Sequence, residues 1–357
     1  MYTSRHRPAF ALIWLLSLAT ALVLPLLAQS AAADSTLKVM TRNVYHGSEF
    51  DELATATTPQ EFVAAVTTIY QRLLASKPAE RMAAIAKEIA RHDPDIVGLQ
   101  EVSILRTGTV SPSTEVKFDL LQFLVEELAK LGHDYSIVGI LPGPDFEAPT
   151  ALGFFARLTI QDAMIVRNKS DLKLSNHQVQ RYLVQATVTS PIAGTIANPA
   201  GWISVDVRMH GRSARVVTTH LPFIADFNPA VPLANAKELL ATAGNTTLPV
   251  VFVGDFNTPA NVPANPLYAI YAHLINSGLT DAWLQVNPTD PGLTCCQAPD
   301  LSNTQSINSV RFDMVLVRGG IRVHSARLVG DEPGDRRAAV RWPSDHAGVV
   351  VNLTLPR

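Results

Sequence analysis

Cysteine and a surplus of basic residues are what this sequence lacks most clearly. Its 357 residues include two cysteines, and 29 Lys and Arg stand against 31 Asp and Glu. A protein that binds nucleic acid mainly through phosphate contacts is usually basic, so the near balance argues against that class of binder. Charged residues are 17% of the chain, whereas 47% are hydrophobic. This composition fits a globular protein with a sizeable core, and no internal repeat divides it.

The two cysteines are neighbours, Cys295 and Cys296. Adjacent Cα atoms across a trans peptide lie about 3.8 Å apart, less than the roughly 4.4 to 6.8 Å that a disulfide usually spans. A vicinal disulfide is therefore possible but strained. Two thiols could also bind a soft metal, although no histidine stands beside them in the sequence. The state of this pair stays open at this stage.

The first 33 residues have the pattern of a secretory signal peptide. Arg5 and Arg7 precede an uncharged apolar run, and small residues follow it up to Ala33. Without a cysteine near the expected cleavage point, the protein is not a lipoprotein. We expect a secreted or periplasmic protein that is more acidic than its formal charge of −2 once the two arginines are removed. Because the run could also span a bilayer, an uncleaved membrane anchor is the alternative.

Helical and strand patterns alternate along the rest of the chain. Apolar spacing at Phe62, Val66, Ile69 and Leu73 predicts an amphipathic helix within 47–79. Further helices are expected at 80–91, 117–131, 229–243 and 265–276. Strands are expected at 37–40, 95–99, 135–140, 158–167, 179–188, 202–209, 214–219, 249–254, 312–317, 321–328 and 347–354. Clusters of Pro and Gly predict loops at 142–149, 191–201 and 258–266. This order favours one α/β domain in which helices cover two packed sheets.

Polar side chains follow several of the expected strands. The residues that come at or just after the ends of the early strands are Asn43, Glu101, His220, Asp255 and Asn257. Late in the chain the order reverses, because Asp313 stands at the start of one strand, and Asp345 and His346 precede another. If the late strands run antiparallel to the early ones, six segments meet at one rim. Each residue alone has an ordinary role at a loop or cap, and their joint occurrence is what favours a site.

Four of these rim residues are carboxylates: Glu101, Asp255, Asp313 and Asp345. Like charges placed together raise some of their pKa values unless a cation lies among them. Oxygen ligands favour Mg²⁺, Mn²⁺ or Ca²⁺ over Zn²⁺. A hard divalent cation beside two imidazoles and two carboxamides is suited to phosphoryl chemistry, where catalysis depends on positioning and charge neutralisation.

Eight stretches of the chain resemble the endonuclease/exonuclease/phosphatase superfamily, whose fold is DNase I-like. They are MTRNV (40–44), DIVGLQEV (95–102), DAMIVRN (162–168), VVTTHL (216–221), VVFVGDFN (250–257), LTDAW (279–283), RFDMVLVRG (311–319) and SDHAGVVV (344–351). The resemblance to an exported bacterial-type member covers about residues 37–354. It implies a four-layer α/β sandwich with two central mixed or antiparallel sheets and a catalytic domain over 34–357. The stretch at about 47–79 departs from the family pattern and is expected to be a helical insertion.

The resemblance also implies roles for the residues around the metal and the attacking water. Glu101 resembles the family's principal ligand of a divalent ion, expected to be Mg²⁺ or Mn²⁺ with Ca²⁺ as a further option. Asn43 would support the metal or a phosphate oxygen, and Asp345 would be a second metal contact or part of the same network. Asp255 in GDFN resembles the residue that orients and deprotonates the water.

On the phosphate side the resemblance implies a second group of residues. Asn257 would stabilise the five-coordinate phosphorus, and His346 would contact the phosphate while Asp313 holds its tautomer. His220 resembles the histidine that donates to the phosphate or to the leaving oxygen. Asp162 stands where the family has a less uniform residue on the phosphate side.

The substrate is less defined than the reaction, because the superfamily includes nucleases, sphingomyelinases, inositol-phosphate phosphatases and deadenylases. Export disfavours roles in DNA repair or mRNA decay, and a secreted nuclease or phosphodiesterase is the expected function. A sphingomyelinase-like phospholipase C, in which Phe154 and Phe155 would enter a membrane, or an inositol-phosphate phosphatase is the alternative. Outside enzymes, the chain could be a secreted binding module on an inactive version of the fold. The expected substrate is thus a phosphoester in nucleic acid, a phospholipid head group or a small phosphorylated molecule, bound by a monomer without an obligate protein partner.

Overall fold

The structure is a computed structural model that describes Met1 and residues 36–223, 228–336 and 341–357. The chain separates into two compact units, Met1–Asp34 and Ser35–Arg357, and the second carries everything that follows. Apart from Met1, the predicted signal peptide at 1–33 lies outside the described residues. None of the described helices has the length and apolar character needed to cross a bilayer.

The helices begin and end where local chemistry predicts. Their bounds are α1 (Asp51–Thr55), α2 (Pro59–Ala75), α3 (Pro78–His92), α4 (Leu120–Lys130), α5 (Ala230–Ala241), α6 (Tyr268–Asn276) and α7 (Ala282–Val286), with a 3₁₀ turn at Pro333–Asp335. At the start of α2 the Thr58 hydroxyl accepts from the Glu61 amide and Glu61 reaches back, so a capping box fixes this end. Val66, Ile69 and Leu73 are buried, which confirms the predicted apolar face.

Two large sheets contain most of the strands. The first sheet has the order β15 (Arg322–Val329), β16 (Gly348–Thr354), β1 (Thr36–Asn43), β2 (Ile96–Gln100), β6 (Phe155–Arg167), β3 (Ile104–Gly108) and β4 (Glu115–Asp119), and β5 (Tyr135–Pro149) also pairs with β6. The second has the order β13 (Thr280–Asp281), β14 (Asp313–Arg318), β12 (Val250–Asp255), β11 (Arg212–His220), β10 (Gly201–Met209) and β7 (Leu172–Arg181). A separate hairpin pairs β8 (Ala186–Ser190) with β9 (Gly194–Asn198).

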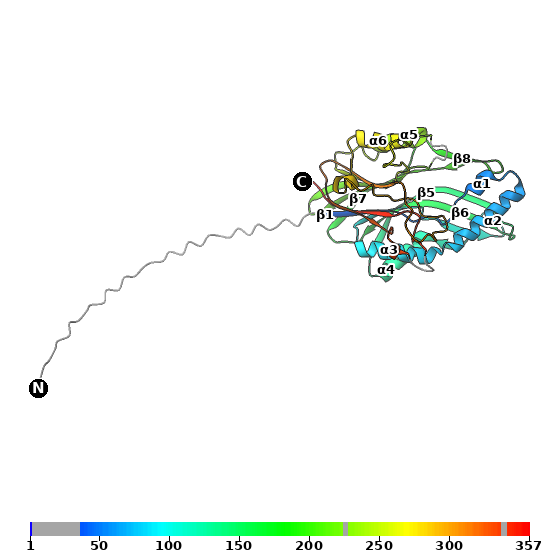
Figure 1. Ribbon diagram of the computed structural model, residues 1–357, viewed down its shortest axis with the longest axis horizontal. Helices are drawn as coiled ribbons and strands as arrows, with labels where there is room; N and C mark the ends of the chain where they lie inside the picture. The colour runs from blue at the N-terminus through cyan, green and yellow to red at the C-terminus, as the bar shows by residue number, and fades with distance from the viewer. Residues whose placement is uncertain (2–35, 224–227, 337–340) are drawn as a thin grey trace. The chain divides into compact units, whose positions relative to one another are not determined.

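Three buried apolar clusters hold four layers together. One lies between the sheets and includes Val39 of β1 and Val251 of β12. A second joins the first sheet to α2, α3 and α4, and a third joins the second sheet to α5 and α6. In Figure 1, α3 and α4 accordingly lie on the opposite side of the sheets from α5 and α6. The predicted α/β architecture of two mixed sheets flanked by helices is confirmed.

The strand directions bring the polar strand ends to one rim. β1 and β2 are parallel, so both end at the same edge of the first sheet. β11 and β12 are also parallel, so both end at the same edge of the second sheet. β14 runs antiparallel to β12, and β16 runs antiparallel to β1, as predicted for the late strands. As a result, Asp255 at the end of β12 pairs with both His220 and Asp313 across the sheet.

Several predicted boundaries were wrong. The stretch 117–131 is not one helix, because β4 occupies its start and α4 begins only after the Asp119 cap. The expected loop at 142–149 is the second half of β5, whose prolines are tolerated because β5 pairs on one side only, with β6. The expected strand at 179–188 is divided between β7 and β8, and the loop at 191–201 contains β9. β3 was not predicted.

A buried ion pair connects the LTDAW and RFD stretches. Asp281 accepts from the Arg311 guanidinium at 2.5 Å and from the Tyr271 hydroxyl at 2.9 Å, and its other oxygen caps α7 through the Trp283 amide at 2.9 Å. We expect Asp281→Asn to lower the free energy of unfolding by about 3 to 5 kcal/mol, because it leaves a buried guanidinium without its counter-charge.

Urea denaturation would measure this loss of stability. Asp171→Asn is the control, since Asp171 pairs with His210 at the surface and an exposed pair contributes about 1 kcal/mol or less. A loss below that limit for Asp281→Asn would show that the Asp281 charge does not stabilise this region.

Candidate active site

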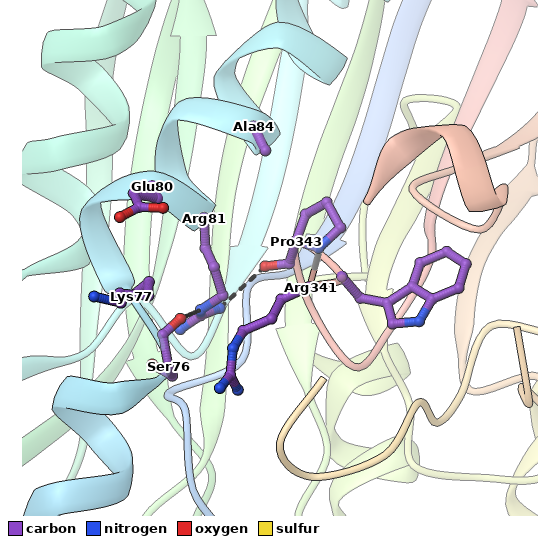
Figure 2. A pocket seen from close by; sticks show the side chains of 8 residues that line it. Ser76, Lys77, Glu80, Arg81, Ala84, Arg341 and Pro343 are labelled. Carbon is purple, nitrogen blue, oxygen red and sulfur yellow. Dashed lines mark hydrogen bonds between the residues drawn. The ribbon is translucent and has the colours of Figure 1, made fainter. Parts of the chain in front are cut away.

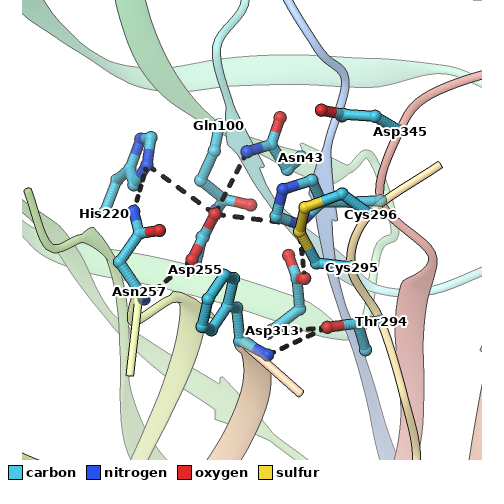
Figure 3. Close-up of polar contacts among 12 residues, drawn as sticks. Asn43, Gln100, His220, Asp255, Asn257, Thr294, Cys295, Cys296, Asp313 and Asp345 are labelled. Carbon is cyan, nitrogen blue, oxygen red and sulfur yellow. Dashed lines mark hydrogen bonds and ion pairs between the residues drawn. A yellow bond between two sulfur atoms is a disulfide. The ribbon is translucent and has the colours of Figure 1, made fainter. Parts of the chain in front are cut away.

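Asp255 lies at the centre of the polar rim. Its side chain is buried, with 1% exposure. The preceding residue, Gly254, lets β12 approach β11 closely, because a Cβ atom on residue 254 would lie 1.9 Å from the Thr219 carbonyl oxygen. One carboxylate oxygen accepts from the backbone amide of Asn257 at 2.8 Å, and the other accepts from the side-chain Nδ2 of Asn43 at 3.2 Å. Figure 3 shows these contacts from both sides of the carboxylate. Both oxygens are thus held in fixed directions.

His346 and Asp313 form a buried pair next to Asp255. His346 Nδ1 lies 2.7 Å from one Asp313 oxygen and 3.8 Å from Asp255. Burial opposes protonation of the imidazole, but Asp313 and Asp345 raise the pKa of His346 well above its usual value. Thr294 orients Asp313 by accepting from its backbone amide. Because Nδ1 is committed to Asp313, Nε2 is the nitrogen that can act on a substrate.

Glu101 lies beside Asp255, and Asn43 connects the two. Asn43 Nδ2 donates to Glu101 at 3.0 Å as well as to Asp255, while the His46 amide donates to the second Glu101 oxygen at 3.0 Å. Glu101 has a φ of 64°, a strained conformation of the kind that collects at functional sites. Burial raises the pKa of Glu101, but His46 and His220 lower it more, to about 2. Glu101 is therefore ionised.

His220 lies on the opposite side of Asp255, between Asp162 and Asn257. Its Nδ1 lies 3.3 Å from Asp162, and its Nε2 lies 3.1 Å from the Asn257 amide group and 3.7 Å from Asp255. Burial lowers the pKa of His220, but Asp162, then Asp255 and Glu101, raise it to about 10. The Asn257 side-chain nitrogen that faces Nε2 also donates to the Leu221 carbonyl oxygen at 2.9 Å, which fixes the orientation of this amide. Asp162 also accepts from the Glu101 amide at 3.2 Å, which ties both sides of the site together.

Asp345 is the one predicted site residue that stands apart. Figure 3 places it at the edge of the group, where its carboxylate accepts a long bond of 3.4 Å from Ser344. Burial and the charge of Glu101 raise the pKa of Asp345 to about 7, although His346 opposes them. The carboxylate affects the site through its charge, and none of the contacts described for it joins it to Glu101.

The site has the properties of a cation site. Ligand atoms of Asp255, Asp313 and His346 lie within 4.8 Å of one another, all buried. One Asp313 oxygen is buried without a hydrogen-bond partner, and burial raises the pKa of Asp313. Together with Glu101, this set offers mainly oxygen atoms. Such a donor set fits a hard divalent ion.

Comparison with known proteins agrees with the geometry. A family model described as Endonuclease/Exonuclease/phosphatase family matches residues 43–346, a range that begins and ends on two of the site residues. The chain belongs to this family. Members of the family cleave phosphoester bonds, so the chain is assigned to the phosphoesterases. Sequence comparison with curated proteins gives no significant match.

Solved structures of distant relatives share the fold. An endonuclease/exonuclease/phosphatase family protein from Leptotrichia buccalis C-1013-b is 18% identical with a TM-score of 0.54, and the match covers 89% of this chain and all of the other. A humanized D. rerio TDP2 is 15% identical with a TM-score of 0.53, covering 90% and 99%. The human Nocturnin catalytic domain is 18% identical with a TM-score of 0.52, covering 90% and 94%. At these identities the likeness concerns the fold alone.

In this family member, a buried ion pair that was not predicted, Arg42 with Glu88, lies next to the site. Arg42, inside the MTRNV stretch, donates to Glu88 at 3.0 Å and also to the His346 carbonyl oxygen. It therefore positions the backbone of His346. Its partner could have been suspected from the sequence, because Glu88 follows Arg81 by seven residues and both lie on the otherwise apolar face of α3.

Arg81 connects the first and last motifs of the family. Its guanidinium donates to the carbonyl oxygens of Val44 (2.6 Å), Tyr45 (2.8 Å) and Pro343 (3.1 Å). Figure 2 shows the side chain extending from α3 toward Pro343. Burial lowers the pKa of Arg81 to about 10, so it stays charged at neutral pH. One guanidinium thus holds the loop after Asn43 against the loop before Asp345.

The cysteines lie beside the histidine that the sequence did not place near them. Cys295 and Cys296 form a disulfide, and the Cys295 backbone forms a bridge with His346. Both sulfur atoms lie within 4.8 Å of a ring nitrogen of His346. No histidine stands beside the pair in the sequence, and His346 comes next to it because two distant segments meet here. Cys295 is buried and Cys296 is exposed, so the disulfide forms part of the rim.

Proposed function

We propose that the protein is a divalent-metal-dependent phosphodiesterase that drives water onto phosphorus in line with the leaving oxygen. The observation that carries this proposal is the position of Asn43, whose amide nitrogen contacts both Glu101 and Asp255. It places a candidate metal ligand and a candidate base beside one another. Family membership supports the reaction class.

The metal would be held by Glu101, with Asp345 as an outer charge. Asn43, predicted as a ligand, turns its Nδ2 toward Glu101 and its Oδ1 toward the Tyr45 amide, so in this arrangement it positions the Glu101 carboxylate. Mg²⁺ or Mn²⁺ is favoured and Ca²⁺ also suits oxygen ligands. When bound, such an ion neutralises negative charge on the phosphoryl oxygens. Its charge would also offset the burial and the Glu101 charge that raise the pKa of Asp345.

The chain's own residues divide the remaining work. Asp255, directed by the Asn257 amide, orients a water molecule and takes its proton, as a general base must. His346, held by Asp313, donates from Nε2 to a phosphoryl oxygen. His220 and Asn257 stand on the other side of Asp255. His220 donates to the phosphate or to the leaving oxygen, and Asn257 stabilises the five-coordinate phosphorus. Donors fixed before the reaction stabilise the charge that develops on phosphorus.

Metal removal tests the proposal directly. We expect the full-length protein to hydrolyse bis-p-nitrophenyl phosphate with Mg²⁺ or Mn²⁺, and the rate to fall at least about tenfold with EDTA because charge neutralisation is lost. Added Mg²⁺ in excess of the chelator should restore it, which controls for unfolding. A rate that EDTA leaves unchanged would contradict the metal mechanism. A protein that hydrolyses no phosphoester would instead be a binding module.

For the substrate, a secreted nuclease and a phospholipase C-like enzyme both fit an exported monomer. The mild acidity does not exclude a nuclease, because a bound cation can neutralise phosphate. A specific observation favours the second candidate, since an apolar cavity lies beside the site. Plasmid DNA, RNA and sphingomyelin assayed in parallel would separate the two.

A further inference from the structure

An apolar cavity of about 350 Å³ lies next to the candidate active site. It is bordered by α1 and α2, by β5 and β6 of the first sheet and by the β8–β9 hairpin, and Figure 1 shows α1, α2 and β8 at the same end of this unit. Val66, Ile69 and Leu73 of α2 and Leu105 of β3 are among its buried lining residues. A cavity of roughly 150 Å³ with such walls already binds benzene. This one falls in the range of ligand pockets, roughly 300 to 1,000 Å³.

Two aromatic rings relate the cavity to the site. Phe50 lines it, and the Phe50 ring meets the His46 ring edge-on with centroids 4.7 Å apart. His46 in turn lies 3.2 Å from the Glu101 carboxylate. Phe50 also faces Phe146 across the cavity lining, at 6.4 Å. The rings of Phe50 and His46 therefore connect the wall of this cavity to the candidate metal ligand.

The lining indicates what kind of group would enter. It contains neither Lys nor Arg, so it has no charge to offer a phosphate chain. Its two carboxylates are already engaged, Asp145 by Arg157 and Glu147 by Ser113. A nucleobase would bring donors and acceptors that these walls leave unsatisfied, at a cost in free energy. An alkyl or acyl chain needs no such partners.

We propose that the cavity binds an alkyl or acyl chain of the substrate, so that the enzyme acts on amphiphilic phosphodiesters. The Ser190 hydroxyl donates to the Leu53 carbonyl at 3.0 Å, which fastens the hairpin to α1 and closes the cavity over the chain. The segment that the sequence set apart as a helical insertion at 47–79 therefore has a role in substrate selection. This inference rests on the proposed phosphodiesterase function.

A chain-length series tests the inference on the full-length protein. The substrates are p-nitrophenyl phosphodiesters carrying methyl, butyl or octyl groups, with the p-nitrophenyl ester of thymidine 5′-phosphate as the nucleotide arm. Each buried methylene contributes about 0.8 kcal/mol, close to fourfold in affinity. We expect kcat/KM to rise at least about 100-fold from methyl to octyl, which requires only about twofold per methylene. The nucleotide ester should be cleaved more slowly than the octyl ester.

A pair of tryptophan variants locates the effect. Ala193 lines the cavity, whereas Ala197 is an equally exposed alanine of the same hairpin that does not. Ala193→Trp should reduce the octyl-to-methyl ratio at least about tenfold by occupying the space for several methylenes, and leave the methyl ester rate unchanged. Ala197→Trp should leave both unchanged. Melting temperatures confirm that both variants fold.

The outcomes separate this inference from the proposed function. Hydrolysis of every ester at a rate independent of chain length would overturn the inference and leave the phosphodiesterase assignment standing. A preference for the nucleotide ester would do the same and favour the nuclease. Hydrolysis of none of them would remove both. Calorimetry with methyl and octyl phosphonate, which are not hydrolysed, gives a second readout, and equal affinities would also overturn the inference.

Discussion

Asp255→Asn is expected to lower kcat on bis-p-nitrophenyl phosphate about a thousandfold, because general-base catalysis contributes roughly 10² to 10⁴. The carboxamide keeps the shape of the side chain and an oxygen to accept from the Asn257 amide, but it cannot take a proton from water. KM should change little, since the phosphate is bound by other groups. Steady-state kinetics with saturating Mg²⁺ measures both parameters.

The control for this substitution is Asp134→Asn, the same chemical change at an exposed position before β5. It should leave kcat unchanged. A circular dichroism spectrum and melting temperature like those of the unchanged protein would show that Asp255→Asn folds. If a folded Asp255→Asn protein kept more than about a tenth of the turnover, the general-base contribution would be below its usual range and Asp255 could not be the base.

The strands that carry the site were predictable because their sequences are unambiguous. The stretch before Asp255 is apolar throughout, as a strand buried on both faces must be, and it forms the fully buried β12. The same holds for β2 before Glu101. Once the strands were placed, the reversed order of Asp313 and His346 could be explained only by antiparallel late strands. The convergence of these residues thus followed from local patterns combined with one topological assumption.

Other features depend on contacts between distant segments, which single-sequence patterns do not encode. Pro142 and Pro149 indicate a loop locally, yet they lie in β5, because pairing with β6 on one side leaves their missing donors harmless. Asp119 acts as a helix cap only after β4 has ended. His46 was overlooked because nothing in the sequence indicates that its imidazole lies 3.2 Å from Glu101.

His346→Ala is expected to reduce kcat by about 100-fold to 1,000-fold, the loss seen when one fixed donor to a developing oxyanion is removed. The imidazole is held by Asp313 at 2.7 Å, and that carboxylate keeps the histidine protonated, so the donor carries a full charge when phosphorus becomes five-coordinate. The substitution of a nearly buried ring also leaves a cavity, so the comparison requires a folded protein at the assay temperature. His324→Ala, at an exposed histidine of β15, is the matched control and should retain full turnover.

The double variant His346→Ala/Asp313→Asn shows how Asp313 acts. If Asp313 acts only by holding His346, its replacement costs about tenfold in the unchanged protein and almost nothing once the imidazole is gone, because residues in one network are not additive. If the two losses of kcat add fully, Asp313 acts independently of His346. It could then be a metal ligand, because one of its oxygens has no hydrogen-bond partner and it lies beside Asp255. The Mg²⁺ concentration at half-maximal rate distinguishes the two roles: it should stay constant across all three variants if Asp313 serves the histidine, and rise with Asp313→Asn if it serves the ion.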